Sequence, residues 1–224
     1  MANEYLTREY ELCFEQLRFY DQRHENILMY TFSLTAAVAT AQFAIYKLLN
    51  GATVIFFKFA ATLSGLVFIA TLLLFMALLQ NRLYFVYMAR QLNAIRGYMM
   101  ETEASGFRNN QLYTAFDFPA LKPFSVHTYT LIGVALISSI FGGGCAYAVG
   151  PALGHVGCLA IGVGTGIVLL VAESAGGIRY LLNAGKRPAD EVIHRMPPAP
   201  KSETPSPSGE GSSGSASSNT SSSS

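Results

Sequence analysis

The stretch that decides the fold is residues 54–100, which reads VIFFKFAATLSGLVFIATLLLFMALL from Val54 to Leu79 and NRLYFVYMARQLNAIRGYMM from Asn81 to Met100. The first part is almost wholly apolar and is long enough to cross a hydrocarbon core of about 30 Å. The second part keeps apolar residues at three- and four-residue steps, the spacing of one helix face, while its arginines fall off that face. We therefore predict one helix that begins in lipid and continues into water.

The composition of the whole chain supports a membrane protein. Of its 224 residues, 51% are hydrophobic and only 13% are charged, whereas about 25% would be charged in a typical soluble domain. The formal net charge is +1, so no basic field points to a nucleic-acid partner. The three cysteines, Cys13, Cys145 and Cys158, have no paired spacing, and we interpret them as packing residues rather than a disulfide framework.

Four apolar stretches separated by polar segments predict an all-α polytopic membrane protein, with four transmembrane helices and amphipathic cytosolic helical extensions. We expect a tight turn between the third and fourth spans at Gly150-Pro151. The Pro- and Ser-rich end cannot bury enough apolar area to order itself. The expected segments are a cytosolic amphipathic helix (1–26), a transmembrane hairpin (27–80), a cytosolic helix and loop (81–125), a second transmembrane hairpin (126–173), a cytosolic stub (174–195) and a disordered tail (196–224).

Charge placement predicts the orientation of the chain. With these spans, thirteen of the fifteen lysines and arginines fall on one side of the membrane, and only Lys47 and Lys58 fall on the other. Because basic residues concentrate in cytoplasmic loops, we expect a multi-pass protein of the cell inner (plasma) membrane with both termini in the cytoplasm.

The N-terminal segment carries a narrow apolar seam at alternating four- and three-residue steps, a spacing typical of helix pairing. Two interpretations are open. The seam packs against the other cytosolic helix of the same chain, or it joins copies of the chain in an oligomer. Its residues are Leu6, Tyr10, Cys13, Leu17 and Tyr20.

Small residues recur four apart over the whole length of the fourth span, so that we expect one helix to carry a complete row of them. Because lipid supplies little hydrophobic drive between helices, close backbone approach through small residues is a main source of association there. This row either packs on the third span of the same chain or forms an oligomer contact, and we expect a homo-oligomer packed partly through it. The row is Gly150, Gly154, Cys158, Gly162 and Gly166.

Two polar residues are candidates for a pore or vestibule. Gln42 lies in the first span, where an amide either lines a pore or bonds to a neighbouring helix. Glu173 lies at the inner end of the fourth span, where a carboxylate either anchors the helix at the headgroups or shapes ion selectivity.

The cytosolic part of the second helix holds the motif R-x-L-N-x-I-R, in which Arg90, Asn93 and Arg96 follow one another at one-turn steps. One interpretation is contact with lipid phosphates and with carboxylates of the N-terminal helix. The other is a ligand or partner site, because arginine forks suit phosphate and asparagine adds directional hydrogen bonds.

No motif for catalysis or metal binding is apparent in the sequence. The four histidines are scattered singly, no paired cysteines or acidic clusters have ligand spacing, and no nucleophile motif occurs. We expect no enzyme activity, no catalytic residue, no metal and no cofactor.

The acidic N-terminal helix ending in Y-D-x-R at Tyr20–Arg23, the four short spans and the R-x-L-N-x-I-R helix together resemble a group of small uncharacterised bacterial four-span membrane proteins. The resemblance covers most of residues 4–182. More remotely, the layout is similar to SLATT-type membrane effectors, which usually have two spans. Neither resemblance assigns a role to a residue.

Two functions remain open. The first is an oligomeric integral membrane protein acting as an ion-permeable channel or membrane effector. The alternative is a membrane scaffold or adaptor that docks a cytosolic protein partner through its cytosolic helices. Both have the lipid bilayer as surroundings, and neither involves nucleic acid.

Overall fold

The computed structural model describes residues 2–102, 119–122, 124–153 and 159–186. These residues form four helices: α1 (Ala2–Leu48), α2 (Val54–Thr102), α3 (Val126–Ala152) and α4 (Leu159–Ala184). Each helix contains a stretch long and apolar enough to cross a membrane. The described part of the chain is therefore all-helical, as predicted, and is compatible with a multi-pass integral membrane protein.

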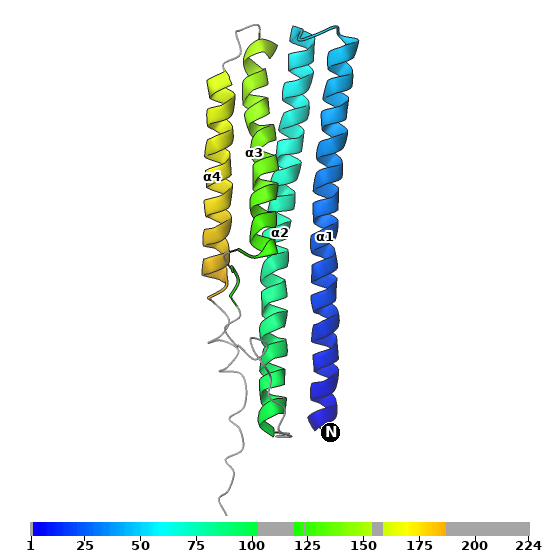
Figure 1. Cartoon of the computed structure of the whole chain (residues 1–224), viewed down its shortest axis with the longest axis vertical. Coiled ribbons are helices and arrows are strands. Elements are labelled where there is room, and N and C mark those ends of the chain that lie inside the picture. The colour runs from blue at the N-terminus through cyan, green and yellow to red at the C-terminus, as the bar shows by residue number, and fades with distance from the viewer. Residues whose placement is uncertain (1, 103–118, 123, 154–158, 187–224) are drawn as a thin grey trace, which may run out of the picture.

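The helices stand in a row in the order of the sequence (Figure 1). α1 packs on α2, α2 on α3 and α3 on α4, and only small contacts join α2 to α4 and α1 to α3. Within the described part of the chain, α1 and α4 do not pack on each other. The row therefore has two open edges rather than the closed cross-section of a four-helix bundle.

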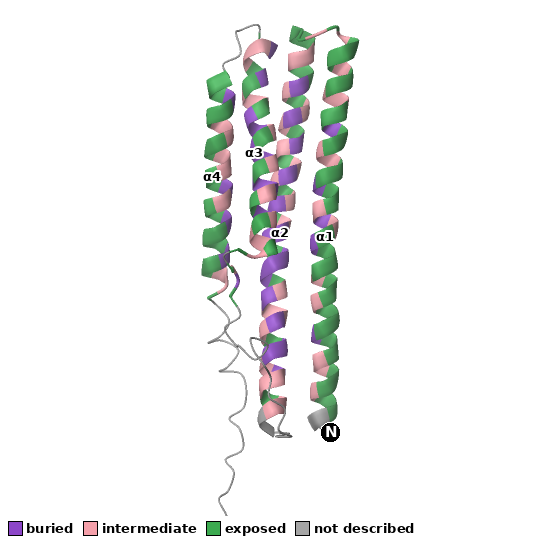
Figure 2. Ribbon diagram, viewed as in Figure 1, coloured by how far each residue is buried: buried purple, intermediate pink, exposed green. Residues whose placement is uncertain are grey.

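The core lies along α2. Figure 2 shows buried residues concentrated on α2 and on the face of α3 beside it, whereas α1 and α4 are exposed over most of their surface. The main apolar cluster collects side chains from all four helices around α2 and includes Ile27, Phe75, Leu78, Leu79, Leu83, Val86, Leu131, Val134, Ala135 and Leu181.

α1 and α2 continue well past the ends of α3 and α4 (Figure 1). We call this protruding pair, residues 2–26 of α1 and 81–102 of α2, the stalk. The sequence prediction that one helix runs from the apolar stretch into the amphipathic stretch is confirmed, because α2 continues without interruption from Val54 to Thr102.

Two predicted segments are continuous with the neighbouring spans, and one predicted turn is misplaced. The N-terminal helix and the first span form one helix, and α4 continues into the expected stub as far as Ala184. Gly150 and Pro151 lie in the last turn of α3, not in a turn between spans. Pro151 leaves one carbonyl of the preceding turn without its helical N–H donor, and continued helix keeps the neighbouring backbone groups paired. The predicted tail and most of the predicted 105–123 loop lie outside the described residues.

Short connections and caps fix the helix ends. The turn from α1 to α2 places Asn50 and Gly51 at positive φ, 52° and 128°, the backbone region that glycine and asparagine tolerate best. α3 begins at the N-cap Ser125, whose hydroxyl accepts a hydrogen bond from the backbone N–H of Thr128. Such a cap satisfies one of the unpaired donors of the first turn.

Candidate functional site

The two helices of the stalk are held together by a small apolar cluster. Cys13 of α1 and Leu92 and Ile95 of α2 are buried together, with Tyr10, Leu17 and Met99 packed around them. Three members of the predicted seam, at positions 10, 13 and 17, therefore face α2 of the same chain. This arrangement supports the intramolecular interpretation of the seam.

The two arginines of the predicted strip on α2 contact two different helices. The guanidinium Nη1 of Arg90 donates to the carbonyl oxygen of Gly185 at 2.8 Å, and the hydroxyl of Tyr87 donates to the carbonyl of Ala184 at 3.3 Å. Because the last carbonyls of a helix have no partner within it, these contacts cap the end of α4. Arg90 thus joins the stalk to the foot of α4.

Arg96 points to the other side. Its Nε and Nη2 donate to the hydroxyl of Tyr10 in α1 at 3.2 and 2.9 Å, and its guanidinium lies over the tyrosine ring. Asn93, between the two arginines in sequence, is buried. The structure therefore places Arg90 and Arg96 in contacts that join α2 to α4 and α1, with Asn93 buried between them in the sequence.

Gln42 joins α1 to α2 in the apolar part of the row. Its side-chain Nε2 donates to the hydroxyl oxygen of Ser64 at 2.9 Å. A hydrogen bond between helices is the commoner role of an amide in lipid, and this contact supports it over a pore lining.

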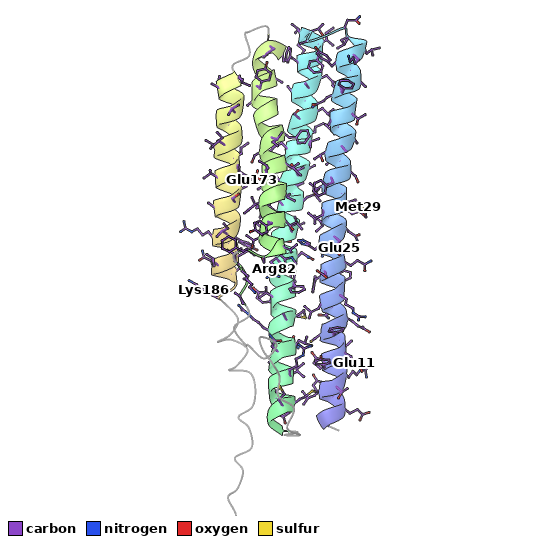
Figure 3. The ribbon with its side chains drawn as sticks, viewed as in Figure 1. Glu11, Glu25, Met29, Arg82, Glu173 and Lys186 are labelled. Atoms are coloured by element: carbon purple, nitrogen blue, oxygen red, sulfur yellow. The ribbon has the colours of Figure 1, made fainter. Side chains whose placement is uncertain are left out.

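Glu173 is buried on the face of α4 that meets α3. The hydroxyl of Ser138 donates to its Oε1 at 2.9 Å. Its other oxygen, Oε2, is buried and has no hydrogen-bond partner among the described residues. Figure 3 places Glu173 on α4 well above the level of Arg82 and Lys186, within the part of the row where all four helices stand together.

The row of small residues does not run along one helix. Gly150 lies in α3, Gly162 and Gly166 lie in α4, and Gly154 and Cys158 lie outside the described residues. A Cβ atom added to Gly162 would lie 2.7 Å from Cβ of Tyr147, and one added to Gly143 would lie 2.6 Å from the carbonyl oxygen of Gly162. Gly162 and Gly166 of α4 are thus in direct contact with α3, which supports packing within the chain.

Sequence reasoning missed one cluster, at the level where the stalk joins the row. The rings of His24 in α1 and His127 in α3 meet edge to face, with centroids 4.9 Å apart. Beside them on α2, Arg82 donates from Nε to the carbonyl of Ala120 at 3.1 Å, and Asn81 donates to the carbonyl of Tyr20 at 2.8 Å. We call His24, Asn81, Arg82 and His127 the junction cluster.

No spacing rule could have revealed the junction cluster, because its two histidines come from different helices. Burial lowers the pKa of His24, and the positive charge of Arg82 lowers it further, while Asp21 and Glu25 act in the opposite direction. Burial also lowers the pKa of Arg82 to about 10. The Nε2 of His24 and the Nδ1 of His127 are buried without a hydrogen-bond partner among the described residues.

In the part of the chain that the structure describes, no three His, Cys, Asp or Glu side chains are grouped so that they could hold a metal ion. Comparisons of the chain with protein-family models, with curated proteins and with solved structures find no match.

Proposed function

We propose that the protein is a membrane scaffold without enzyme activity, which docks a cytosolic protein through its stalk. In this proposal both termini and the stalk are cytoplasmic, as the distribution of basic residues predicts. The arginines of the strip and the glycines at the α3–α4 contact already have partners within the chain. The proposal therefore depends on a different surface.

That surface is an exposed apolar stripe on the stalk part of α1. Tyr5, Leu12 and Phe19 are 68%, 46% and 58% exposed. They stand seven residues apart, a repeat that places side chains on one helix face. In the proposed orientation this stripe faces water, and aligned apolar side chains outside a membrane commonly mark a protein interface.

Charge indicates what kind of partner fits the stripe. Residues 2–26 contain six acidic side chains and three arginines, so the surroundings of the stripe are acidic. A second copy would bring like charges together, whereas a basic amphipathic helix would complement them. We therefore propose such a helix of a cytosolic protein as the partner.

A synthetic Lys/Leu amphipathic peptide tests this proposal on the full chain in nanodiscs of zwitterionic lipid. We expect fluorescence anisotropy to show binding of the peptide, and we expect this binding to weaken with added salt. The peptide should bind about tenfold more weakly to the Leu12→Glu variant, because the new carboxylate would lie in an apolar contact. A photo-crosslinking residue in place of Leu12 should react with the peptide.

Phe14 provides the matched control. It is on the same helix and 40% exposed, but two residues from Leu12, which places it on a different face. A crosslinker there should react weakly. Equal reaction at positions 12 and 14, or equal binding of a Glu/Leu peptide with the same apolar face, would contradict the scaffold proposal.

A second candidate is the oligomeric, ion-permeable protein, and the open row favours it. α1 and α4 do not pack on each other within the described residues, so successive copies could join edge to edge into a closed ring. Ion flux in liposomes that contain the purified protein would support this function. A protein that is monomeric in several mild detergents and passes no ions would contradict it.

A further inference from the structure

Among the described residues, Glu173 is the one carboxylate that is buried. Its side chain is 9% exposed, and Ser138, to which it is hydrogen-bonded, is 0% exposed. One turn away from Glu173 and Ser138 on both helices, Leu169 of α4 meets Gly142 of α3, where an added Cβ atom would clash with the leucine side chain. The carboxyl group is therefore part of a tight α3–α4 interface and not a side chain at its margin.

α2 closes this interface from the other side. Phe68 lies beside Gly142, and Phe75 lies beside Gly177, one turn beyond Glu173. Thr71 stands between these two phenylalanines on the same face of α2 and is 0% exposed. Glu173 thus lies at a level where three helices meet and where buried hydroxyl groups are present on both α2 and α3.

An ionised carboxylate in such surroundings needs a positive partner. Transfer of an isolated charge out of water costs several kcal/mol even after relaxation, and ionisable groups inside membranes are costly unless they serve a function. The hydroxyl of Ser138 donates its hydrogen bond to Oε1, and Oε2 is buried without a partner among the described residues. The smallest cation that Oε2 can take without displacing a neighbour is a proton.

We propose that Glu173 is an exchangeable proton-binding site within the membrane, with Oε2 as the atom that binds the proton and Ser138 as the residue that positions the carboxyl group. Binding takes one proton from water and forms an O–H bond at Oε2, and release returns that proton to water. The hydrogen bond from Ser138 to Oε1 is compatible with both states.

A small cavity lies on the stalk side of this site. It has a volume of about 10 Å³ and is lined by residues of α2, α3 and α4 that include Phe75, Thr128, Ser174 and Gly177. This volume is about that of one water-sized sphere. Ser174 and Gly177 follow Glu173 directly and one turn later on α4, so the cavity lies beside the turn of α4 that follows the carboxyl group.

An apolar carbodiimide tests the proposal on the full chain in nanodiscs. The reagent takes the proton of a neutral carboxylic acid on nitrogen while the carboxylate oxygen adds to its central carbon, and the adduct rearranges to a stable N-acylurea. We expect mass spectrometry to find this adduct at Glu173. Its yield should fall about tenfold or more as the pH is raised from about 5 to about 9, because the reactive acid disappears.

Two variants and one internal control sharpen the test. Glu173→Gln should give no adduct at this position while keeping the same helical circular dichroism and particle size. Ser138→Ala removes a hydrogen bond that favours the ionised form, so its adduct should persist to higher pH. Glu11 is exposed on the stalk and should react with a water-soluble carbodiimide instead.

Three results would overturn the proposal. The first is the absence of an adduct at Glu173, and the second is a yield that does not change with pH. The third is protection by sodium ions at constant pH, which would assign the site to a metal cation. Because none of these measurements involves the stalk or a partner, the proton site and the scaffold proposal can fail independently.

Discussion

His24, buried against His127 where the stalk joins the row, should make the stability of the protein depend on pH. Its pKa is lowered in the folded chain by burial first and by Arg82 next, against the opposing effects of Asp21 and Glu25. The unfolded chain therefore binds a proton more readily. The free energy of unfolding is highest above the unfolded pKa of about 6.5 and falls as the pH drops below it, by at most about 1.4 kcal/mol per pH unit for one proton.

This prediction is checked by chemical unfolding in nanodiscs at several pH values between about 5 and 7.5, with circular dichroism as the measure of unfolding. His24→Gln cannot take up the proton, so its unfolding free energy should decline less over this range than that of the unchanged chain. Identical slopes for the two proteins would contradict the role assigned to His24.

Residue roles could be predicted from the sequence only where a periodic apolar face marks both partners. The apolar seam around Cys13 was visible from its spacing, and its partners Leu92 and Ile95 lie on the helix face that the sequence also predicted. The target of Arg90 could not be predicted, because its acceptor, the carbonyl of Gly185, is a backbone atom 95 residues away. Spacing in one helix carries no information about such an acceptor.

At the scale of elements, close contact between α3 and α4 should make some of their glycines sensitive to substitution. Gly162→Leu would place a side chain against Tyr147 and the backbone of Gly143, and overpacking of this kind costs roughly 1–3 kcal/mol. We expect a lower unfolding temperature in detergent, measured by circular dichroism.

Gly164→Leu is the matched control. A Cβ atom at Gly164 has no neighbour within 4 Å, so the same leucine two residues away should leave the unfolding temperature nearly unchanged. If both variants are equally destabilised, the loss arises from something other than the α3–α4 contact. If Gly162→Leu alters only the particle size, the glycine serves an oligomer instead.

The helices themselves were more predictable than their ends. Long apolar runs and three- to four-residue periodicity predict α2 well, because both signals persist over many turns. The boundary between α3 and α4 was misplaced because Gly150-Pro151 is a typical turn sequence in water. Among apolar helices the pairing of backbone groups outweighs that local preference, and α3 continues to Ala152.

At the scale of the whole molecule, the order of the row could not be predicted. In a soluble protein an apolar face identifies the side that packs. In a membrane helix, lipid-facing and packed faces are both apolar, so periodicity does not reveal which helix lies beside which. The absence of α1–α4 packing among the described residues is therefore information that only the structure supplies.

The orientation of the row in the membrane gives a further prediction. Single cysteines at Asn3 and Lys186, in a chain freed of its own cysteines, should resist an impermeant maleimide in intact cells and react after permeabilisation. A cysteine at Asn50, in the turn at the opposite end, should react in intact cells. This pattern follows from the concentration of basic residues at the stalk end, and the reverse pattern would place the stalk outside.

The tight turn at residues 49–53 joins α1 to α2 at the end opposite the stalk, and α1 packs almost only on α2. α1 can therefore act as a lever with its pivot at that turn, and stalk contacts such as those of Tyr10 and Cys13 with α2 hold its far end in place. With 47 residues it is about 70 Å long. Swinging it by about 5° would carry the tip about 6 Å, with the largest displacement where Tyr5 and Leu12 lie.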